Sequence, residues 1–178
     1  MKENWTIVDV LRHVRHDWMN QLQLIKGNLE LNKIDRAKEI MNDIITSAQQ
    51  ESRLTNLKLP RLAELLITFN WRPHRFKIKY EVIDDQINIM KHDEMLTKWF
   101  KAFLEKLEEG SASFSDNLLT ILIDKQDQQA RFFFDYRGTI INKTPIEQFL
   151  SEPYHDVQTI LVQSHIEDIL VFELFISL

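Results

Sequence analysis

Residues 8–29 read VDVLRHVRHDWMNQLQLIKGNL, and this stretch decides the first part of the fold. Its apolar side chains recur in steps of three and four residues, which is the spacing of one face of an α-helix. They are Val8, Leu11, Trp18, Leu22, Ile25 and Leu29. A helix from Asn4 to Leu31 is therefore expected, and the near-heptad spacing is typical of a helical bundle.

A second amphipathic helix is expected after a break at Asn32 and Lys33, with Asp35 as its N-cap. Its apolar positions are Ala37, Ile40, Met41, Ile44 and Ala48. A short loop between two long helices makes them antiparallel neighbours. Two amphipathic helices cannot bury both apolar faces by themselves. We therefore predict that the hairpin pairs with a second copy into a homodimeric four-helix bundle.

After this hairpin the periodicity changes to a mixture of short helices and strands. Helices are expected over residues 60–69, 93–107 and 144–150, and strands over 76–82, 118–124, 131–136, 157–164 and 169–177. This order indicates an α+β sandwich, with helices on one face of a mostly antiparallel sheet.

The charge distribution supports a boundary near Pro60. Residues 1–59 carry nine Lys and Arg against eight Asp and Glu, whereas residues 60–178 carry thirteen against nineteen. We predict two domains, residues 1–58 and 59–178. The net charge of −5 argues against nucleic acid as the main partner. Because no apolar run approaches the roughly 18–20 residues of a membrane span, no membrane association and a cytoplasmic location are expected.

The composition excludes several kinds of site. The 178 residues contain no cysteine, so a disulfide, a thiol nucleophile and a cysteine-based zinc site are excluded. The three glycines are Gly27, Gly110 and Gly138. They lie too far apart for phosphate-binding loops that use two or three glycines within about six residues. The histidines show no metal-ligand spacing, so no metal site is expected.

A polar stripe lies opposite the apolar face of the first helix. With successive residues about 100° apart, His16 lies roughly 140° from the centre of the apolar stripe. The same exposed face carries Arg12, Asn20, Gln23 and Gly27, and His13 and Asp17 flank it.

An exposed imidazole is mostly neutral at pH 7 and can accept a phosphoryl group. Arg12 would offset the charge of that group, Asn20 would donate a hydrogen bond to it, and Asp17 would orient the ring. Gly27 would leave room for the backbone of a partner. A surface histidine among polar residues is also ordinary, so spacing alone leaves both interpretations open.

A longer motif favours the functional interpretation. Residues 15–29, RHDWMNQLQLIKGNL, resemble the phosphoacceptor helix of the sporulation initiation phosphotransferase B family and that of the related citrate/fumarate-type sensor histidine kinases. Residues 51–58 (ESRLTNLK), 66–71 (LITFNW) and 80–82 (YEV) resemble the phosphotransferase family specifically.

This resemblance implies a phosphorelay phosphotransferase. A phosphoryl group would pass from the aspartate of a single-domain response regulator to His16, and then to the aspartate of a second, transcription-factor response regulator. The resemblance also implies a dimeric bundle followed by a domain similar to a histidine-kinase ATPase domain. Arg15, Gln23 and Gly27 are expected to contact the regulators.

Beside the histidine-kinase ATPase domains that it resembles, the C-terminal domain is expected to lack a nucleotide site. The helix over residues 103–109 (FLEKLEE) has no asparagine for Mg²⁺, and residues 134–139 (FDYRGT) hold a single glycine. The chain is therefore expected to bind no cofactor of its own, with Mg²⁺ supplied by the response-regulator partner. Two alternatives stay open: an ATP-using relative of the sensor histidine kinases, and a non-catalytic dimeric scaffold that sequesters response regulators.

Overall fold

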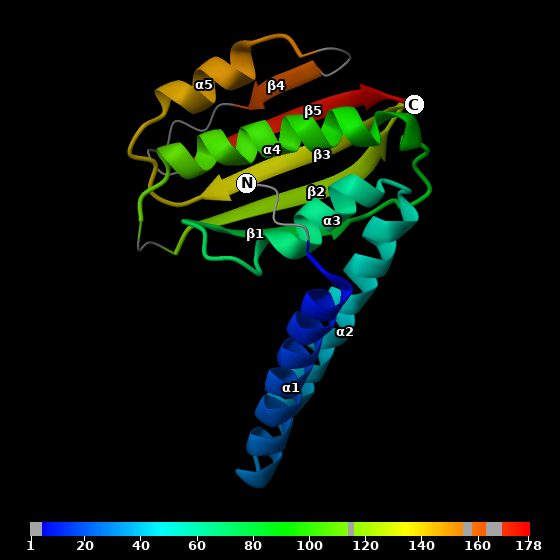
Figure 1. Cartoon of the computed structure of the whole chain (residues 1–178), viewed down its shortest axis with the longest axis vertical. Coiled ribbons are helices and arrows are strands. Elements are labelled where there is room, and N and C mark those ends of the chain that lie inside the picture. Colours follow the sequence, from blue (N-terminus) through cyan, green and yellow to red (C-terminus); the bar gives the residue numbers. More distant parts are fainter. Residues whose placement is uncertain (1–4, 114–115, 155–157, 163–168) are drawn as a thin grey trace. The chain divides into compact units, whose positions relative to one another are not determined.

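A computed structural model describes residues 5–113, 116–154, 158–162 and 169–178, with the backbone alone for 158–162. Its elements in chain order are α1 (Ile7–Glu30), α2 (Ile34–Asn56), α3 (Pro60–Phe69), β1 (Lys77–Val82), η1 (Met90–His92), α4 (Asp93–Gly110), β2 (Leu118–Gln126), β3 (Gln129–Arg137), α5 (Thr144–Ser151), β4 (Gln158–Val162) and β5 (Ile169–Ser177) (Figure 1). The predicted α+β class, with a helical hairpin before an α/β sandwich, is confirmed. Part of the strand predicted over residues 157–164 lies outside the described residues.

The chain forms two compact units, Met1–Gln49 and Gln50–Leu178. Their boundary falls inside α2, so that one continuous helix contributes to both units. The domain boundary predicted between residues 58 and 59 stays a prediction.

The first unit is a helical hairpin closed by a tight turn. Asn32 takes a positive φ of 54° in this turn, and the Lys33 amide donates to the carbonyl of Asn28 over 2.8 Å. The predicted N-cap at Asp35 is wrong. Helix α2 already begins at Ile34, because Lys33 closes the turn, and Asp35 lies inside the first helical turn.

The apolar stripe of α1 is uncovered in the single chain. Within Ile7–Glu30, all of which is described, no residue is buried. Five of the six stripe residues are 45–63% exposed: Val8, Leu11, Trp18, Leu22 and Leu29. The helix is therefore built with an apolar face that its own chain does not cover.

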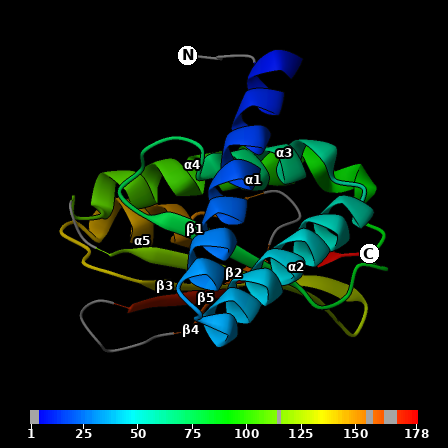
Figure 2. The same cartoon turned by 90° about the horizontal axis from the view of Figure 1, so that it is seen from below.

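The second unit is a five-stranded sheet in the order β1-β2-β3-β5-β4. Strands β1 and β2 are parallel, and the other neighbours are antiparallel. Helices α3 and α4 lie against the same face of the sheet (Figure 2). On this face the register aligns Ile121 with Phe134 and Phe134 with Phe172, all fully buried.

An aromatic cluster joins α4 to the sheet. Trp99 and Phe103 stack with ring centroids 5.4 Å apart, and Phe134 stacks on Phe172 at 4.3 Å. These four side chains are at most 1% exposed. Burying large aromatic side chains is a dominant stabilising contribution in a domain of this size.

The outer edge of β1 is closed by side chains from α2 and from the end of α3. Asn70 accepts from the Ile78 amide over 3.0 Å and donates to the Ile78 carbonyl over 2.7 Å. Gln50 accepts from the Val82 amide over 2.7 Å, and Arg53 donates to the Val82 carbonyl over 3.0 Å. The backbone groups of Ile78 and Val82, which a neighbouring strand would otherwise bind, are therefore already satisfied.

Helix α3 is capped by a residue distant in sequence. Its own N-cap, Leu59, has no side-chain oxygen to offer. Instead the Asp93 carboxylate, at the start of α4, accepts from the amides of Arg61 and Leu62 over 3.1 Å each. Because Asp93 is also the first residue of α4, one buried carboxylate lies at the N-termini of two helices.

Candidate functional site

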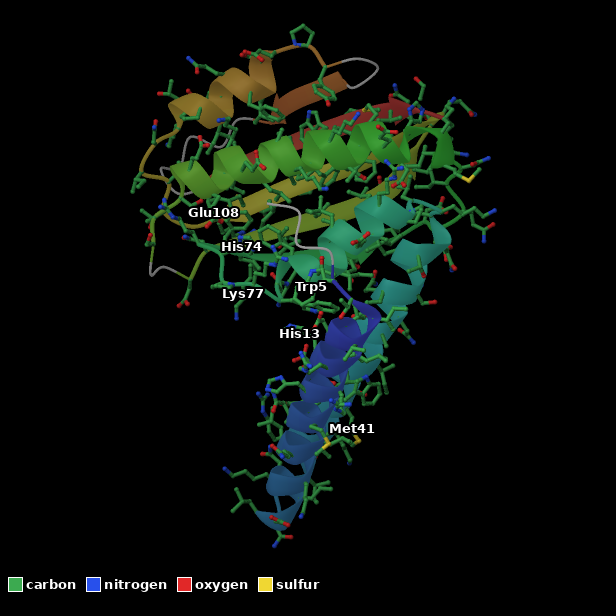
Figure 3. All side chains as sticks on the ribbon, viewed as in Figure 1. Trp5, His13, Met41, His74, Lys77 and Glu108 are labelled. Atoms are coloured by element: carbon green, nitrogen blue, oxygen red, sulfur yellow. The ribbon has the colours of Figure 1, made fainter. Side chains whose placement is uncertain are left out.

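The polar stripe begins where α1 begins, at a capping box. The Asp9 amide donates to the Thr6 hydroxyl over 3.2 Å, and the Thr6 amide donates to the Asp9 carboxylate over 3.3 Å. Just before this cap, Trp5 meets the His13 ring edge-on, with centroids 4.8 Å apart (Figure 3). These contacts fix the helix start at Ile7, about two and a half turns before His16.

The His16 ring is exposed and has two polar neighbours on its own helix. Its side chain is 70% exposed, and Nδ1 lies 3.2 Å from Asp17 Oδ1. The Asn20 amide nitrogen lies 3.3 Å from Nδ1 and 3.4 Å from Nε2. In the tautomer with its hydrogen on Nδ1, the ring donates to Asp17 and Nε2 keeps its lone pair. Nε2 is then the nucleophilic atom.

Arg12 has an acidic partner on its own helix. Arg12 is predicted to offset the charge of a phosphoryl group on His16, and in the unmodified chain its Nη1 lies 3.0 Å from Asp9 Oδ1, with the side chain 65% exposed. Hydrogen bonds from Thr6 and the charge of Arg12 hold the pKa of Asp9 below its usual value. Sequence reasoning missed Asp9, although a Thr-x-x-Asp spacing before an apolar run is a signal for a helix cap.

The three predicted partner-contact residues are accessible on α1. Arg15 and Gln23 are exposed. A Cβ atom added at Gly27 would meet nothing within 4 Å. Glycine inside a helix costs about 1 kcal/mol relative to alanine, so the fold of the single chain gives no reason for Gly27.

Gly138, by contrast, has a structural role. It takes a φ of 154°, and a Cβ there would lie 2.2 Å from Asn117 Oδ1. Asn117 is buried and ties three backbone segments together: it donates to the carbonyls of Arg75 and Ala112 and accepts from the Thr139 amide. This glycine makes room for an asparagine side chain.

Other charged groups of the second unit form contacts that support the fold. His74 stacks on Phe69 with centroids 3.9 Å apart, and its Nδ1 lies 3.5 Å from Glu108 Oε2 (Figure 3). Glu108 also accepts from the Arg75 amide over 3.0 Å.

Among the residues that the structure describes, no three or more His, Asp and Glu side chains gather as metal ligands. His155 and His165 lie outside the described residues.

Two family models match the chain, one for each part. Residues 1–57 match the model described as "Sensor kinase SpoOB-type, alpha-helical domain", and residues 58–177 match "Sporulation initiation phospho-transferase B, C-terminal". The chain belongs to the sporulation initiation phosphotransferase B family. The family resemblance carried by residues 15–29 is thereby confirmed.

A relative from Bacillus subtilis (strain 168), sporulation initiation phosphotransferase B, is 35% identical over 153 residues, which is 85% of this chain and 80% of the relative. As its family membership shows, the chain is a sporulation initiation phosphotransferase. No helix in the described ranges is long and apolar enough to cross a membrane.

Solved structures show only a weak likeness. A bacterial phosphotransferase structure has 12% identity and a TM-score of 0.38, covering 96% of this chain and 98% of that one. The catalytic domain of histidine kinase ThkA has 9% identity and a TM-score of 0.47, covering 66% and 90%. The family assignment comes from the sequence matches.

Proposed function

We propose that His16 carries the phosphoryl group, receiving it from an aspartyl phosphate of one response regulator and passing it to the aspartate of a second. The observation that carries this proposal is the exposed His16 ring, held by Asp17 and Asn20 on the polar stripe of α1. The family of the chain supplies the activity class.

The transfer needs no oxidant, and the His16 ring loses no proton during it. The Nε2 lone pair of His16 forms the P–N bond as the P–O bond of the acyl phosphate breaks, and the aspartate leaves as a carboxylate. The ring then carries a positive charge with its hydrogen still on Nδ1, where the Asp17 carboxylate faces it. The reverse step on the second regulator releases neutral imidazole. Positioning and charge compensation are the tasks left to the chain.

The Mg²⁺ for this transfer is proposed to come from the response regulator, and the chain itself is proposed to bind no cofactor. The second unit is proposed to be a degenerate ATPase-like domain without a nucleotide site. On α4, the side chains of Phe103 and Leu107 pack in the hydrophobic core. Residues 134–139 contain one glycine, Gly138, and its missing side chain leaves room for Asn117. Micromolar binding of ATP to the purified chain would overturn this part and favour the sensor-kinase alternative.

The hairpin is proposed to form a four-helix bundle with a second copy. The support is the uncovered apolar stripe, because exposed apolar patches of this kind usually mark interfaces. Leu22→Glu, on the stripe, is expected to give monomers by sedimentation equilibrium. Leu24→Glu is the matched control, since Leu24 is 57% exposed and lies on the other side of the same helix. A dimer that survives Leu22→Glu would contradict the bundle.

The phosphoacceptor is tested by labelling with a phosphorylated receiver domain. His16→Gln is expected to abolish acid-labile label, whereas His13→Gln, one turn earlier on α1, is expected to keep it. Full label in His16→Gln would overturn the mechanism. A wild-type chain that binds the receiver without ever becoming labelled would favour the scaffold alternative.

A further inference from the structure

The two carboxylate oxygens of Asp9 contact different residues. Oδ2 accepts from the backbone and hydroxyl of Thr6, which completes the capping box. Oδ1 lies 3.0 Å from Nη1 of Arg12. With its pKa lowered by these contacts, the carboxylate is ionised over the whole physiological range. Oδ1 takes no part in the bonds from Thr6, and it offers Arg12 an anionic partner.

Arg12 lies between two positions that compete for it. Asp9 is three residues before it and His16 four residues after it, and both spacings place side chains on one helix face within reach of each other. At about 1.5 Å per residue, Asp9 and His16 are separated by roughly 10 Å along the axis. The guanidinium therefore cannot form its full pairing with both. Since its side chain is 65% exposed, Arg12 can change partner without disturbing any packing.

We propose that Asp9 is a positioning residue, which holds Arg12 while His16 is unmodified and yields it to the phosphoryl group when His16 is phosphorylated. This inference rests on the proposed function of His16. The exchange replaces one charge-assisted hydrogen bond of Arg12 by another. The cost of breaking the Asp9 pair offsets part of what Arg12 contributes to the phosphorylated state.

This competition has a consequence for a relay. A carrier that binds its phosphoryl group too strongly retains it, because tight binding of an intermediate does not lower the next barrier. Asp9 weakens the net hold of Arg12 on the phosphoryl group and so favours onward transfer. Without the Asp9 charge, the phosphorylated state of His16 is expected to be more populated and slower to discharge.

The test is the equilibrium partition of label between a phosphorylated receiver domain and His16. Asp9→Asn keeps an oxygen for the Thr6 amide but removes the charge that holds Arg12. It is expected to raise the ratio of label on His16 to label on the receiver by about two- to fivefold, the range for an exposed ion pair, and with it the fraction of label on His16. Arg12→Gln is expected to lower this fraction, and the double variant is expected to match Arg12→Gln alone.

Thr6→Ala is the matched control, because it removes the hydroxyl of the cap but leaves the residue 6 amide that donates to Asp9 and leaves the Asp9–Arg12 pair. It is expected to leave the partition unchanged. Any of three results would overturn the positioning role. The first is an unchanged partition in Asp9→Asn, the second is an equal shift by Asp9→Asn when Arg12 is already Gln, and the third is a shift in Thr6→Ala as large as that in Asp9→Asn. A wild-type chain that takes no label on His16 would instead overturn the proposed function itself, so the two failures are distinguishable.

Discussion

Removing the Asp93 carboxylate is expected to destabilise the second unit more than any change of an exposed charge. This side chain is 8% exposed and accepts from two amides at the start of α3. In Asp93→Ala both amides lose their acceptor, and the amide of Leu62 is buried. No side chain of α3 can replace it, since Leu59 at the N-cap is apolar.

The expected cost follows from three contributions. A lost helix cap costs about 0.5–2 kcal/mol, and a buried donor left without an acceptor costs about 1–3 kcal/mol. A carboxylate at a helix N-terminus contributes roughly 0.3–1 kcal/mol more. Because the first two overlap, we expect about 2–4 kcal/mol for Asp93→Ala. Asp93→Asn keeps one acceptor oxygen and is expected to cost about half of that.

Urea unfolding followed by far-ultraviolet circular dichroism measures this cost. Glu94→Ala is the matched control on the next residue: Glu94 pairs with Lys98 at the surface, 2.8 Å apart, and such pairs contribute less than about 1 kcal/mol. If Asp93→Ala unfolded within about 0.5 kcal/mol of the wild type, or at no lower urea concentration than Glu94→Ala, the assignment of Asp93 as the cap of α3 would be refuted.

Four further changes test other parts of the structure. Gly138→Ala is expected to cost about 2–4 kcal/mol in urea unfolding, because its Cβ would collide with the buried Asn117 amide; a neutral effect would contradict the close approach. Arg131→Met leaves its two carboxylate partners, on β2 and β5, without their shared cation and is expected to cost about 1–2 kcal/mol; unchanged stability would show that the triad contributes nothing. Gly27→Ala is expected to stabilise α1 by about 1 kcal/mol while slowing transfer from a receiver about tenfold; an unimpaired rate would remove Gly27 from the partner surface. Since the folded pKa of Asp9 is lowered, its cap contributes above the unfolded pKa of about 3.9 and is lost as the pH falls through the folded value; the protection factors of the amides in the first turn of α1 should fall below about pH 4, and constant protection factors there would contradict the capping box.

Local signals explain why most elements could be predicted from the sequence. Pro60 and the polar Asn70 delimit α3 at the expected residues, and alternation alone located β1 within one residue. The end of α4 was placed three residues too early. Gly110 is the last residue of α4, and a Cβ there would lie 2.6 Å from the Asn142 carbonyl, so this close approach between distant segments requires a glycine.

The candidate site was predictable as a surface but not as a set of contacts. A helical wheel is enough to place His16 and Asn20 together, because their spacing of four residues fixes that proximity. The partner of Arg12 depends on a choice between two side chains at similar distances along the helix, and periodicity does not decide it. The capping role of Asp93 joins segments more than thirty residues apart in sequence, which no local pattern predicts.

The closed edge of β1 affects how the chain behaves in a crowded cell. An open sheet edge is a template on which a second chain can add a strand, and this is a common first step of aggregation. Asn70, Gln50 and Arg53 occupy hydrogen-bonding positions that such an intruding strand would need. Because the backbone groups of Ile78 and Val82 already have partners, a second chain would have to displace these side chains before it could add a strand here, which protects the chain from irreversible association at this edge.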